Sequence, residues 1–489
     1  MPAVGQSIMW AEPTSRSSFL PPKYSLTEGS IPRALLAFAL PILAGNVLQS
    51  VNGSVNAIWV GRYLGEVALA AAGNSNVVMF LLFGVIFGLS MAATVMVAQC
   101  VGAKNVEEAK RVVGTSAVFF LGIALSLGLL GSLLARPLLS FMQTPHDVMP
   151  LALAYMRIIF MALPFSAGMF FLMAVLRGAG DSRTPFVYLA LAVGLDIVLN
   201  PLFIFGWGPI AGLGIAGSAT ATLTAQGIAF TSLVVHLYRT RHFLRIRRHE
   251  LALFRVDWSL VRVLVTKGIP MGLQMFVLSS SMIALTSLVN RFGAQETAAF
   301  NAAQQLWNYI QMPALAIGAA VSSMAAQNVG AGNWHRVGRV VRTGVAFNWL
   351  IGGSLITLVY LLNRTALGLF LPPHGAAISI AEHLNHIVLW SFILFGTSIV
   401  VFGVMRATGA VVPPLIMLCI SLWAVRVPFA YFMLDRLKAD AIWWSFPLAS
   451  IVSISMAVSY YRFGGWRRAR MGVTGRRPAP LSPTPSESS

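Results

Sequence analysis

Long apolar segments, separated by short polar loops, follow one another through most of the chain. A helix needs about 20 residues to cross the hydrocarbon core of a bilayer, and the segments reach that length. They are continuous rather than alternating, which favours helices over the strands of a membrane β-barrel. The pattern predicts an all-α polytopic membrane protein with twelve transmembrane helices, at 34–60, 68–98, 112–135, 149–172, 184–206, 212–238, 260–290, 295–327, 340–363, 378–403, 412–434 and 441–461.

The composition agrees with a lipid-embedded protein. Charged residues make up 10% of the chain and hydrophobic residues 57%, whereas soluble domains carry roughly 25% charged residues. The net charge of +19 could suggest nucleic acid, but the basic residues lie in loops between apolar segments rather than on one face, so we expect no nucleic-acid partner. The two cysteines, Cys100 and Cys419, form no CxxC pair and indicate no metal site.

The distribution of basic residues predicts the orientation. If both termini and alternate loops are cytoplasmic, most of the 34 lysines and arginines lie on that side. Cytoplasmic loops of membrane proteins carry such an excess. We therefore expect a multi-pass protein of the bacterial inner (plasma) membrane with both termini in the cytoplasm, which also requires an even number of spans.

The chain contains an internal repeat. The segment at 98–115 returns at 326–343 with a constant offset of 228, and a second correspondence has an offset of 229. Each half then holds six helices, both halves enter from the same side, and the two form pseudo-symmetric lobes around an axis normal to the membrane. Such a pair encloses a central cleft. Identical pairs include Gln99/Gln327, Gly102/Gly330, Arg111/Arg339, Arg177/Arg406, Gly180/Gly409 and Pro185/Pro414.

The repeat and the loop composition divide the chain into five parts. We expect a cytoplasmic N-terminal segment (1–30), a first six-helix lobe (31–238), a basic cytoplasmic linker (239–259), a second six-helix lobe (260–462) and a disordered cytoplasmic tail (463–489). The tail is rich in Pro and Ser. The linker either contacts anionic lipid headgroups or serves only to set the topology, and its composition leaves both readings open.

Asp196 is the acidic residue that falls in the middle of a predicted span. Charges at that depth are costly and usually functional. Asn200 lies one helical turn further on the same face, and Pro201 frees a backbone carbonyl. Carboxylate, amide and carbonyl oxygens suit a hard cation. The alternative is a structural Asp whose hydrogen bonds are supplied by neighbouring helices.

Two predicted spans carry stripes of amide side chains. The first holds Gln49, Asn52 and Asn56, and the eighth holds Asn301, Gln304 and Asn308. Amides in lipid must face protein or water, so these residues either line the cleft or hydrogen-bond between helices. We expect kinks at three prolines inside the spans, and a structural role for the intramembrane Arg426. The prolines are Pro41, Pro201 and Pro313.

Motifs of the common enzyme classes are missing. The sequence contains no Walker A motif, no HExxH, no GxSxG and no kinase motif set. We therefore expect no enzyme activity and no cofactor.

Four segments taken together resemble the MATE (multidrug and toxic compound extrusion) family, over roughly residues 30–462. They are PILAGNVLQSVNGSVNAIWVGRYLG (41–65), QCVGAKNVEEAKRVV (99–113), LRGAGDSRTP (176–185) and LDIVLNPLFIFGWGPIAGLG (195–214). The resemblance implies twelve helices in two lobes that open alternately to either side. It also implies a secondary active antiporter that exports cationic or amphipathic small molecules in exchange for protons or sodium ions.

In the DinF-like branch of that family, the resemblance places an ion-coupling site at Asn56, Asp196, Asn200 and Thr222. The chain departs from the branch pattern at Asn56, where an Asp is expected, and in the reversed order of Asp196 and Asn200. One carboxylate suffices for a proton or a transient sodium ion at Asp196, and we favour the proton. The positions matching the acidic residues of the NorM-like branch, near Leu278 and Phe395, are apolar.

We expect the protein to act as a monomer on small-molecule substrates in contact with membrane lipids. The alternative function is a flippase of the related superfamily that moves a lipid precursor. A channel or a receptor is disfavoured by the parallel repeat.

Overall fold

The first half of the chain forms a bundle of six long helices. The computed structural model describes residues 25–207, 210–372 and 375–472. A short hairpin separates the fifth helix from the sixth. Its two strands, β1 (Gly206–Trp207) and β2 (Ile210–Ala211), have two residues each and pair antiparallel. The chain turns there at Gly206 and Gly214, whose φ angles of 78° and 56° suit glycine. The helices are α1 (Ile31–Leu64), α2 (Glu66–Gly102), α3 (Val106–Phe141), α4 (Met149–Gly178), α5 (Arg183–Phe205) and α6 (Ile215–Arg239).

The second half forms a similar bundle from more fragmented helices. Two segments, η4 and η5, are π-helices, and η3 and η6 are short 3₁₀ turns. The elements are α7 (Trp258–Val289), η3 (Asn290–Phe292), α8 (Ala294–Gly330), α9 (Trp334–Phe347), η4 (Asn348–Gly352), α10 (Gly353–Leu361), α11 (Asn363–Leu367), α12 (Ala376–Val388), α13 (Ser391–Thr408), α14 (Val412–Leu418), η5 (Cys419–Arg426), α15 (Val427–Phe432), α16 (Leu434–Leu437), α17 (Asp440–Phe463) and η6 (Gly465–Arg468).

Twelve helices in the described part of the chain are long and apolar enough to cross a membrane, as predicted. The predicted span at 378–403 is broken after Val388, and its membrane-spanning part is Ser391–Thr408. The predicted span at 412–434 contains the π-helix η5, which ends two residues before Pro428. Proline removes a backbone donor and clashes with the preceding turn, and a widened π turn is one way to accommodate it.

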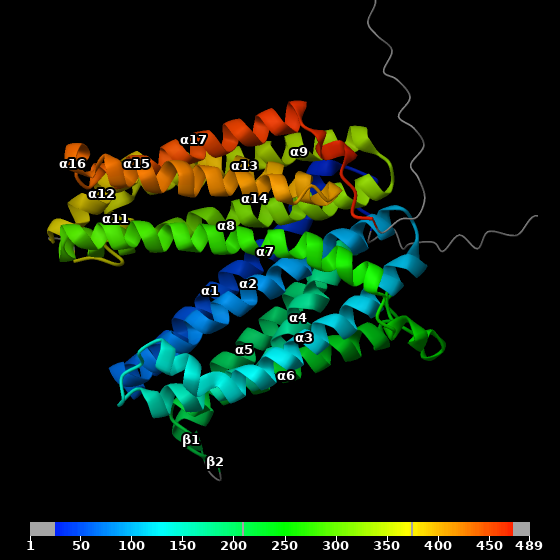
Figure 1. Ribbon diagram of the computed structural model, residues 1–489, viewed down its shortest axis with the longest axis horizontal. Helices are drawn as coiled ribbons and strands as arrows, with labels where there is room; N and C mark the ends of the chain where they lie inside the picture. The colour runs from blue at the N-terminus through cyan, green and yellow to red at the C-terminus, as the bar shows by residue number, and fades with distance from the viewer. Residues whose placement is uncertain (1–24, 208–209, 373–374, 473–489) are drawn as a thin grey trace, which may run out of the picture.

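The two bundles touch at one end of the molecule and diverge toward the other (Figure 1). They meet through α2, which packs on α7 and α8, and through α1, which packs on α8. Both ends of the described chain lie at the joined end: the backbone of Leu26 contacts the Gln327 side chain, and Arg470 lies against Gly409. We call this region the closed end.

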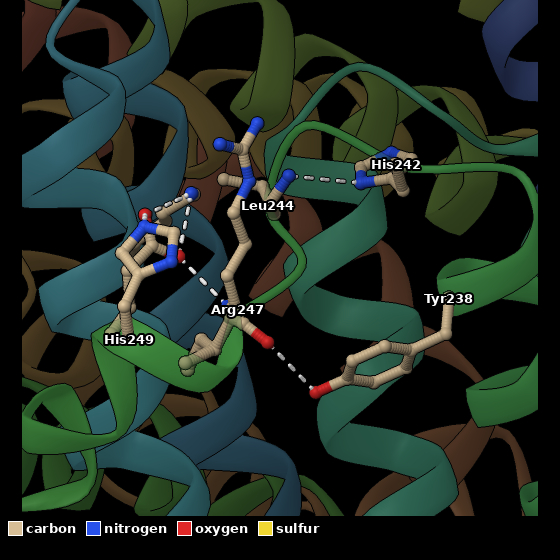
Figure 2. A network of polar contacts seen from close by, with 8 residues as sticks. Tyr238, His242, Leu244, Arg247 and His249 are labelled. Atoms are coloured by element: carbon tan, nitrogen blue, oxygen red, sulfur yellow. Dashed lines mark hydrogen bonds and ion pairs between the residues drawn. The ribbon is translucent and has the colours of Figure 1, made fainter.

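The linker between the bundles is folded rather than extended. Figure 2 shows its internal hydrogen bonds, in which the Tyr238 hydroxyl donates to the Ile246 carbonyl and the Leu244 N–H donates to His242. Its 3₁₀ turn η2 (Arg248–Phe254) packs on α3, and Lys110 Nζ lies 2.7 Å from Glu250 Oε1. A second ion pair joins Arg111 to Asp257. The linker is therefore fixed to the first bundle.

The predicted disordered tail begins too early. The start of the segment, 463–472, is described and packed: Trp466 is buried and stacks on Tyr461 with 5.0 Å between the ring centroids, and Met471 is also buried. An aromatic and a methionine side chain gain enough from burial to hold these residues against the bundle. Residues 473–489 and 1–24 lie outside the described part of the chain, so the predictions for them stay untested.

The linker should come loose when Lys110 loses its charge. We expect Lys110→Met to weaken the docking of η2 by roughly 1–2 kcal/mol, between the values of exposed and buried ion pairs. A spin label at Leu251 should become more mobile by electron paramagnetic resonance. Lys104→Met, at an exposed position in the turn that precedes α3, is the matched control and should leave the label unchanged.

Acid should have the same effect on the wild-type protein. Burial raises the pKa of the Glu250 carboxyl, but the hydrogen bonds from Lys110 and from the Arg247 N–H outweigh it and hold the pKa below its ordinary value of 4.5. A lowered folded-state pKa stabilises the docked linker above pH 4.5, and this contribution is lost as the pH falls through the folded-state value. A label that stays equally immobile at low pH would contradict the role of the pair.

Candidate functional site

Asp196 lies inside the first bundle, where three helices meet. It belongs to α5, which packs on α1 and α6, and its side chain is 4% exposed. Thirteen residues separate it from the start of α5 at Arg183, which corresponds to about 20 Å along a helix. This depth places the carboxylate near the middle of a membrane span.

Four side chains surround the Asp196 carboxylate, and all are neutral. Oδ2 accepts hydrogen bonds from the amides of Asn52 at 3.0 Å and Asn56 at 2.9 Å. Oδ1 accepts one from the Thr222 hydroxyl at 3.0 Å and a longer one from Asn200 at 3.4 Å. The salt bridges found among the described residues do not include Asp196. Its burial is therefore compensated by oriented dipoles rather than by a counter-charge.

Two amide oxygens in this cluster have unused acceptor capacity. Within the described part of the chain, Asn52 Oδ1 and Asn200 Oδ1 are buried without a hydrogen-bond partner. A buried acceptor without a donor costs about 1–3 kcal/mol, so native proteins rarely leave one without a reason. The carboxylate and these oxygens are ligands of the kind that a small hard cation prefers. The carboxylate alone can instead take up a proton.

The structure brings together the four residues predicted for ion coupling. Asn56 links them further, because its Oδ1 accepts a 2.7 Å hydrogen bond from Asn200. Asn52 was predicted only as a cleft-lining residue, yet it contacts the carboxylate directly. The available signal was its spacing: Asn52 and Asn56 are one turn apart and share a helix face.

The donor set does not fit a resident metal cofactor. Among the residues that the structure describes, no three His, Cys, Asp or Glu side chains come together. One carboxylate with amide and hydroxyl oxygens resembles a weak, exchangeable cation site, in which affinity depends on ligand charge.

The other amide stripe lies on the second bundle. Asn301 and Asn308 are exposed and Gln304 is half-buried, although α8 is largely buried over its apolar stretch. Gln49 on α1 is also exposed, and α1 packs against α8. Both stripes are thus on helices that take part in the contact between the bundles. Their role in lining a cleft stays a prediction.

The three prolines lie inside long helices. Pro41, Pro201 and Pro313 interrupt the hydrogen-bonding pattern of α1, α5 and α8 without ending these helices. Pro201 cannot donate to the carbonyl of Ile197, one turn earlier and next to Asp196. Kinks at the three positions stay predictions.

A separate apolar cavity of about 290 Å³ lies between α3, α4, α6 and the linker. Phe165, Phe171 and Phe230 contribute to its walls, and His242 and Arg245 contribute at the linker. Asp196 and its four partners do not line it. The cavity is therefore distinct from the carboxylate site.

The repeat segments contact each other at the closed end. Gln99 of α2 donates to the Ala407 carbonyl of α13 at 2.7 Å, and Gln327 of α8 donates to the Gly178 carbonyl of α4 at 3.1 Å. Gln99 and Gln327 are repeat partners at offset 228. The residues whose carbonyls accept, Gly178 and Ala407, are repeat partners at offset 229. The cross-bundle hydrogen bonds are thus related by the pseudo-twofold axis.

No side chain fits between α2 and α8 at this crossing. A Cβ atom on Gly102 would lie 1.8 Å from the Gln327 carbonyl oxygen, and one on Gly330 would lie 2.0 Å from that of Gln99. Only glycine allows the two backbones to come so close. The N-terminal segment adds to the closure, since Arg336 donates to the Glu28 carbonyl at 2.7 Å.

The family model described as MatE matches the chain at residues 41–202 and 270–432, one block in each bundle. The chain is also similar to the "Probable multidrug resistance protein YoeA" of Bacillus subtilis, with 36% identity over 91% of the chain and 96% of the relative. It is 26% identical to a "FAD transporter" of Shewanella oneidensis over 66% of the chain and 71% of the relative.

Solved structures share the fold. One, described as an outward-facing conformation of a multidrug resistance MATE family transporter of the MOP superfamily, has a TM-score of 0.83 at 20% identity and covers 91% of this chain and 98% of its own. A MOP superfamily transporter from Pyrococcus furiosus, described by a reverse polarity of its binding pocket, has a TM-score of 0.82 at 20% identity, with the same coverage.

A larger side chain at the crossing should force the closed end open. In Gly102→Leu the backbones must separate by roughly 2 Å to restore ordinary contact distances. Spin labels at the exposed positions Lys104 and His335 should then report longer distances by double electron–electron resonance. Gly122→Leu is the control, because a Cβ there meets nothing within 4 Å. Unchanged distances in Gly102→Leu would show that the crossing is not what keeps this end closed.

Proposed function

The chain belongs to the MatE family of transporters, and on that premise we propose that it is a secondary active antiporter that exports cationic or amphipathic small organic molecules in exchange for protons. The observation that carries this proposal is the buried Asp196 carboxylate, held by neutral donors beside two unused amide oxygens. Relatives named as multidrug resistance proteins support the class of substrate.

The two bundles supply the means of alternating access. In the structure they are in contact at the closed end and diverge beyond it (Figure 1). Transport requires a second state in which the crossing of α2 and α8 separates and the opposite ends close. A ligand can drive this change only if it binds the two states with different affinity.

Asp196 can link the cation to that change. Its four partners come from α1, α5 and α6, so the carboxylate holds three helices in one arrangement. Protonation removes the charge that the amides and the hydroxyl stabilise, and the hydrogen-bond pattern must then rearrange. Cation entry and substrate release are coupled when the bundles close differently around the charged and the neutral site.

The number of carboxylates favours a proton over sodium. One carboxylate is enough to carry one proton, whereas cation affinity rises with the charge count of the ligands. At the position of Asn56, the DinF-like branch of the family has a second acidic residue, an Asp. A sodium ion at Asp196, with Asn52 and Asn200 as further ligands, is the alternative driving ion.

A flippase for a lipid precursor is the alternative function. Such a protein needs basic side chains in its interior to receive an anionic headgroup, and Arg426 is the observation in its favour. At the depth of Asp196, the first bundle presents a carboxylate instead. We therefore prefer the exporter.

We further propose that the closed end faces the cytoplasm of a bacterial inner membrane and that the protein acts as a monomer. The basic linker supports this orientation. Its exposed residues Arg241, Arg247 and Arg248 also support contact with anionic lipid headgroups.

Asp196→Asn should abolish transport while preserving the fold. The amide keeps the size of the side chain but neither carries a charge nor takes up a proton. We expect the purified variant in proteoliposomes to export a cationic dye under a proton gradient at a rate at least about tenfold lower than the wild type. Glu66→Gln makes the same chemical change at an exposed position and should transport normally.

The same assay separates the two driving ions. A sodium gradient alone should drive little transport by the wild-type protein. Wild-type rates in Asp196→Asn under either gradient would show that Asp196 is structural and that coupling occurs elsewhere.

Asn56→Asp should turn the site into a stronger cation site. The new carboxylate would lie beside Asp196, because the Asn56 amide is now 2.9 Å from it. Two such acids cannot both stay charged without a cation or a proton between them. We expect sodium to raise the thermal unfolding temperature of this variant by roughly 1–2 °C, in line with about 1 kcal/mol of binding to a chain of this length, and to leave that of the wild type unchanged. Equal sodium effects on both proteins would contradict this account.

A further inference from the structure

Arg426 is a buried charge without a protein counter-charge. It ends the π-helix η5 in the second bundle and is 6% exposed. Its Nε and Nη2 atoms are buried and have no hydrogen-bond partner among the residues that the structure describes. An arginine stays charged in proteins, and a buried charge that lacks partners is strongly destabilising.

The contact that Arg426 does make leaves its donors free. The guanidinium carbon lies 3.6 Å from the centroid of the Phe446 ring. A cation–π contact of this kind contributes about 2 kcal/mol when it is desolvated, but it engages the face of the guanidinium. The N–H groups lie in the guanidinium plane and point away from the ring, where they can still donate hydrogen bonds.

No acidic side chain of the second bundle lies at this depth in the described chain. Its four acids lie on short helices or at the start of long ones, on the side away from the closed end. In the ion pairs found among the described residues, the arginine that takes part is Arg111. An anion that pairs with the Arg426 guanidinium must therefore come from outside the bundle. The four acids are Glu296, Glu382, Asp435 and Asp440.

The repeat places Arg426 next to the register of Asp196. The repeat partners Pro185 and Pro414, near the start of α5 and α14, have an offset of 229. At this offset Asp196 corresponds to Val425, and Arg426 follows it as the last residue of η5. The two bundles thus hold opposite charges within one residue of equivalent positions.

The surroundings of Arg426 are aromatic. Phe446 packs on Trp307 with 5.0 Å between ring centroids and on Phe300 with 6.4 Å. A cation beside aromatic side chains favours a ligand that combines an anionic group with an apolar or aromatic body. Carboxylate and phosphate oxygens match the paired N–H donors of a guanidinium.

We propose that Arg426 binds a carboxylate or phosphate group of the transported molecule, so that the protein exports zwitterionic and anionic amphiphiles as well as cations. This proposal rests on the proposed export function. Arg426 then selects among substrates, whereas Asp196 couples transport to the cation.

A matched pair of probes tests the proposal. A rhodamine with a free carboxylate and its methyl ester differ only in the anionic group. Binding is measured by fluorescence anisotropy to purified protein in nanodiscs of zwitterionic lipid. We expect the wild type to bind the free acid about tenfold or more tightly than the ester, the effect of a charge-assisted hydrogen bond. Arg426→Gln should abolish this preference, so that the acid and the ester bind with equal affinity.

Two further variants separate charge from structure. Arg426→Lys keeps the charge, so it should keep part of the preference even if Arg426→Gln does not fold. Arg436→Gln, at an exposed position, should behave as wild type. A wild type that binds the ester as tightly as the acid overturns the proposal, and so does a preference that survives in Arg426→Gln.

The source of the anion is tested in the same system. Displacement of the free acid by phosphatidylglycerol added to the nanodiscs, or by millimolar inorganic phosphate, would assign Arg426 to a lipid or a free anion and overturn the substrate role. Gradient-driven export of the ester in proteoliposomes tests the proposed function separately. If that export fails while the binding preference holds, the export function is wrong and the anion site stands.

Discussion

The crossing of α2 and α8 holds the two bundles together, and no side chain separates the two backbones there. A Cβ on Gly102 or on Gly330 would fall within 2.0 Å of a carbonyl oxygen of the other helix. At this distance Gln99 and Gln327 reach carbonyls across the interface, so that polar groups in the membrane protein are satisfied without water. These hydrogen bonds add directed contacts to an apolar core that the two bundles share, since buried side chains of α2, α7 and α8 form one continuous cluster.

Within the first bundle, the need to accommodate one carboxylate determines which residues meet. Asp196 has neutral donors on both oxygens, and each comes from a helix that must keep its rotation and depth to reach it. A counter-charge such as arginine would bind the carboxylate more strongly and would hold it ionised. Here oriented neutral dipoles from α1 and α6 take the place of such a counter-charge.

Much of this arrangement could be predicted from the sequence, because the bilayer restricts what a chain can do. The span count follows from apolar length, and Asp196 is conspicuous because other acids lie outside the membrane. The interruptions could not be predicted in the same way. The break after Val388 and the π turn before Pro428 depend on packing against neighbouring helices, which local pattern does not report. The packed tail was missed for a related reason: Trp466 stands among arginines and glycines, and its burial depends on a distant partner.

The two halves are alike where they touch and different inside. Gln99 and Gly102 recur as Gln327 and Gly330, since a crossing on a pseudo-twofold axis works only if both helices contribute the same groups. The interiors are under no such requirement, because each is enclosed by its own bundle. There Asp196 stands among neutral donors in one bundle, and Arg426, one residue from the equivalent position in the other, lies against the Phe446 ring. The two lobes therefore share a closing contact, while each keeps an interior with a charge of its own.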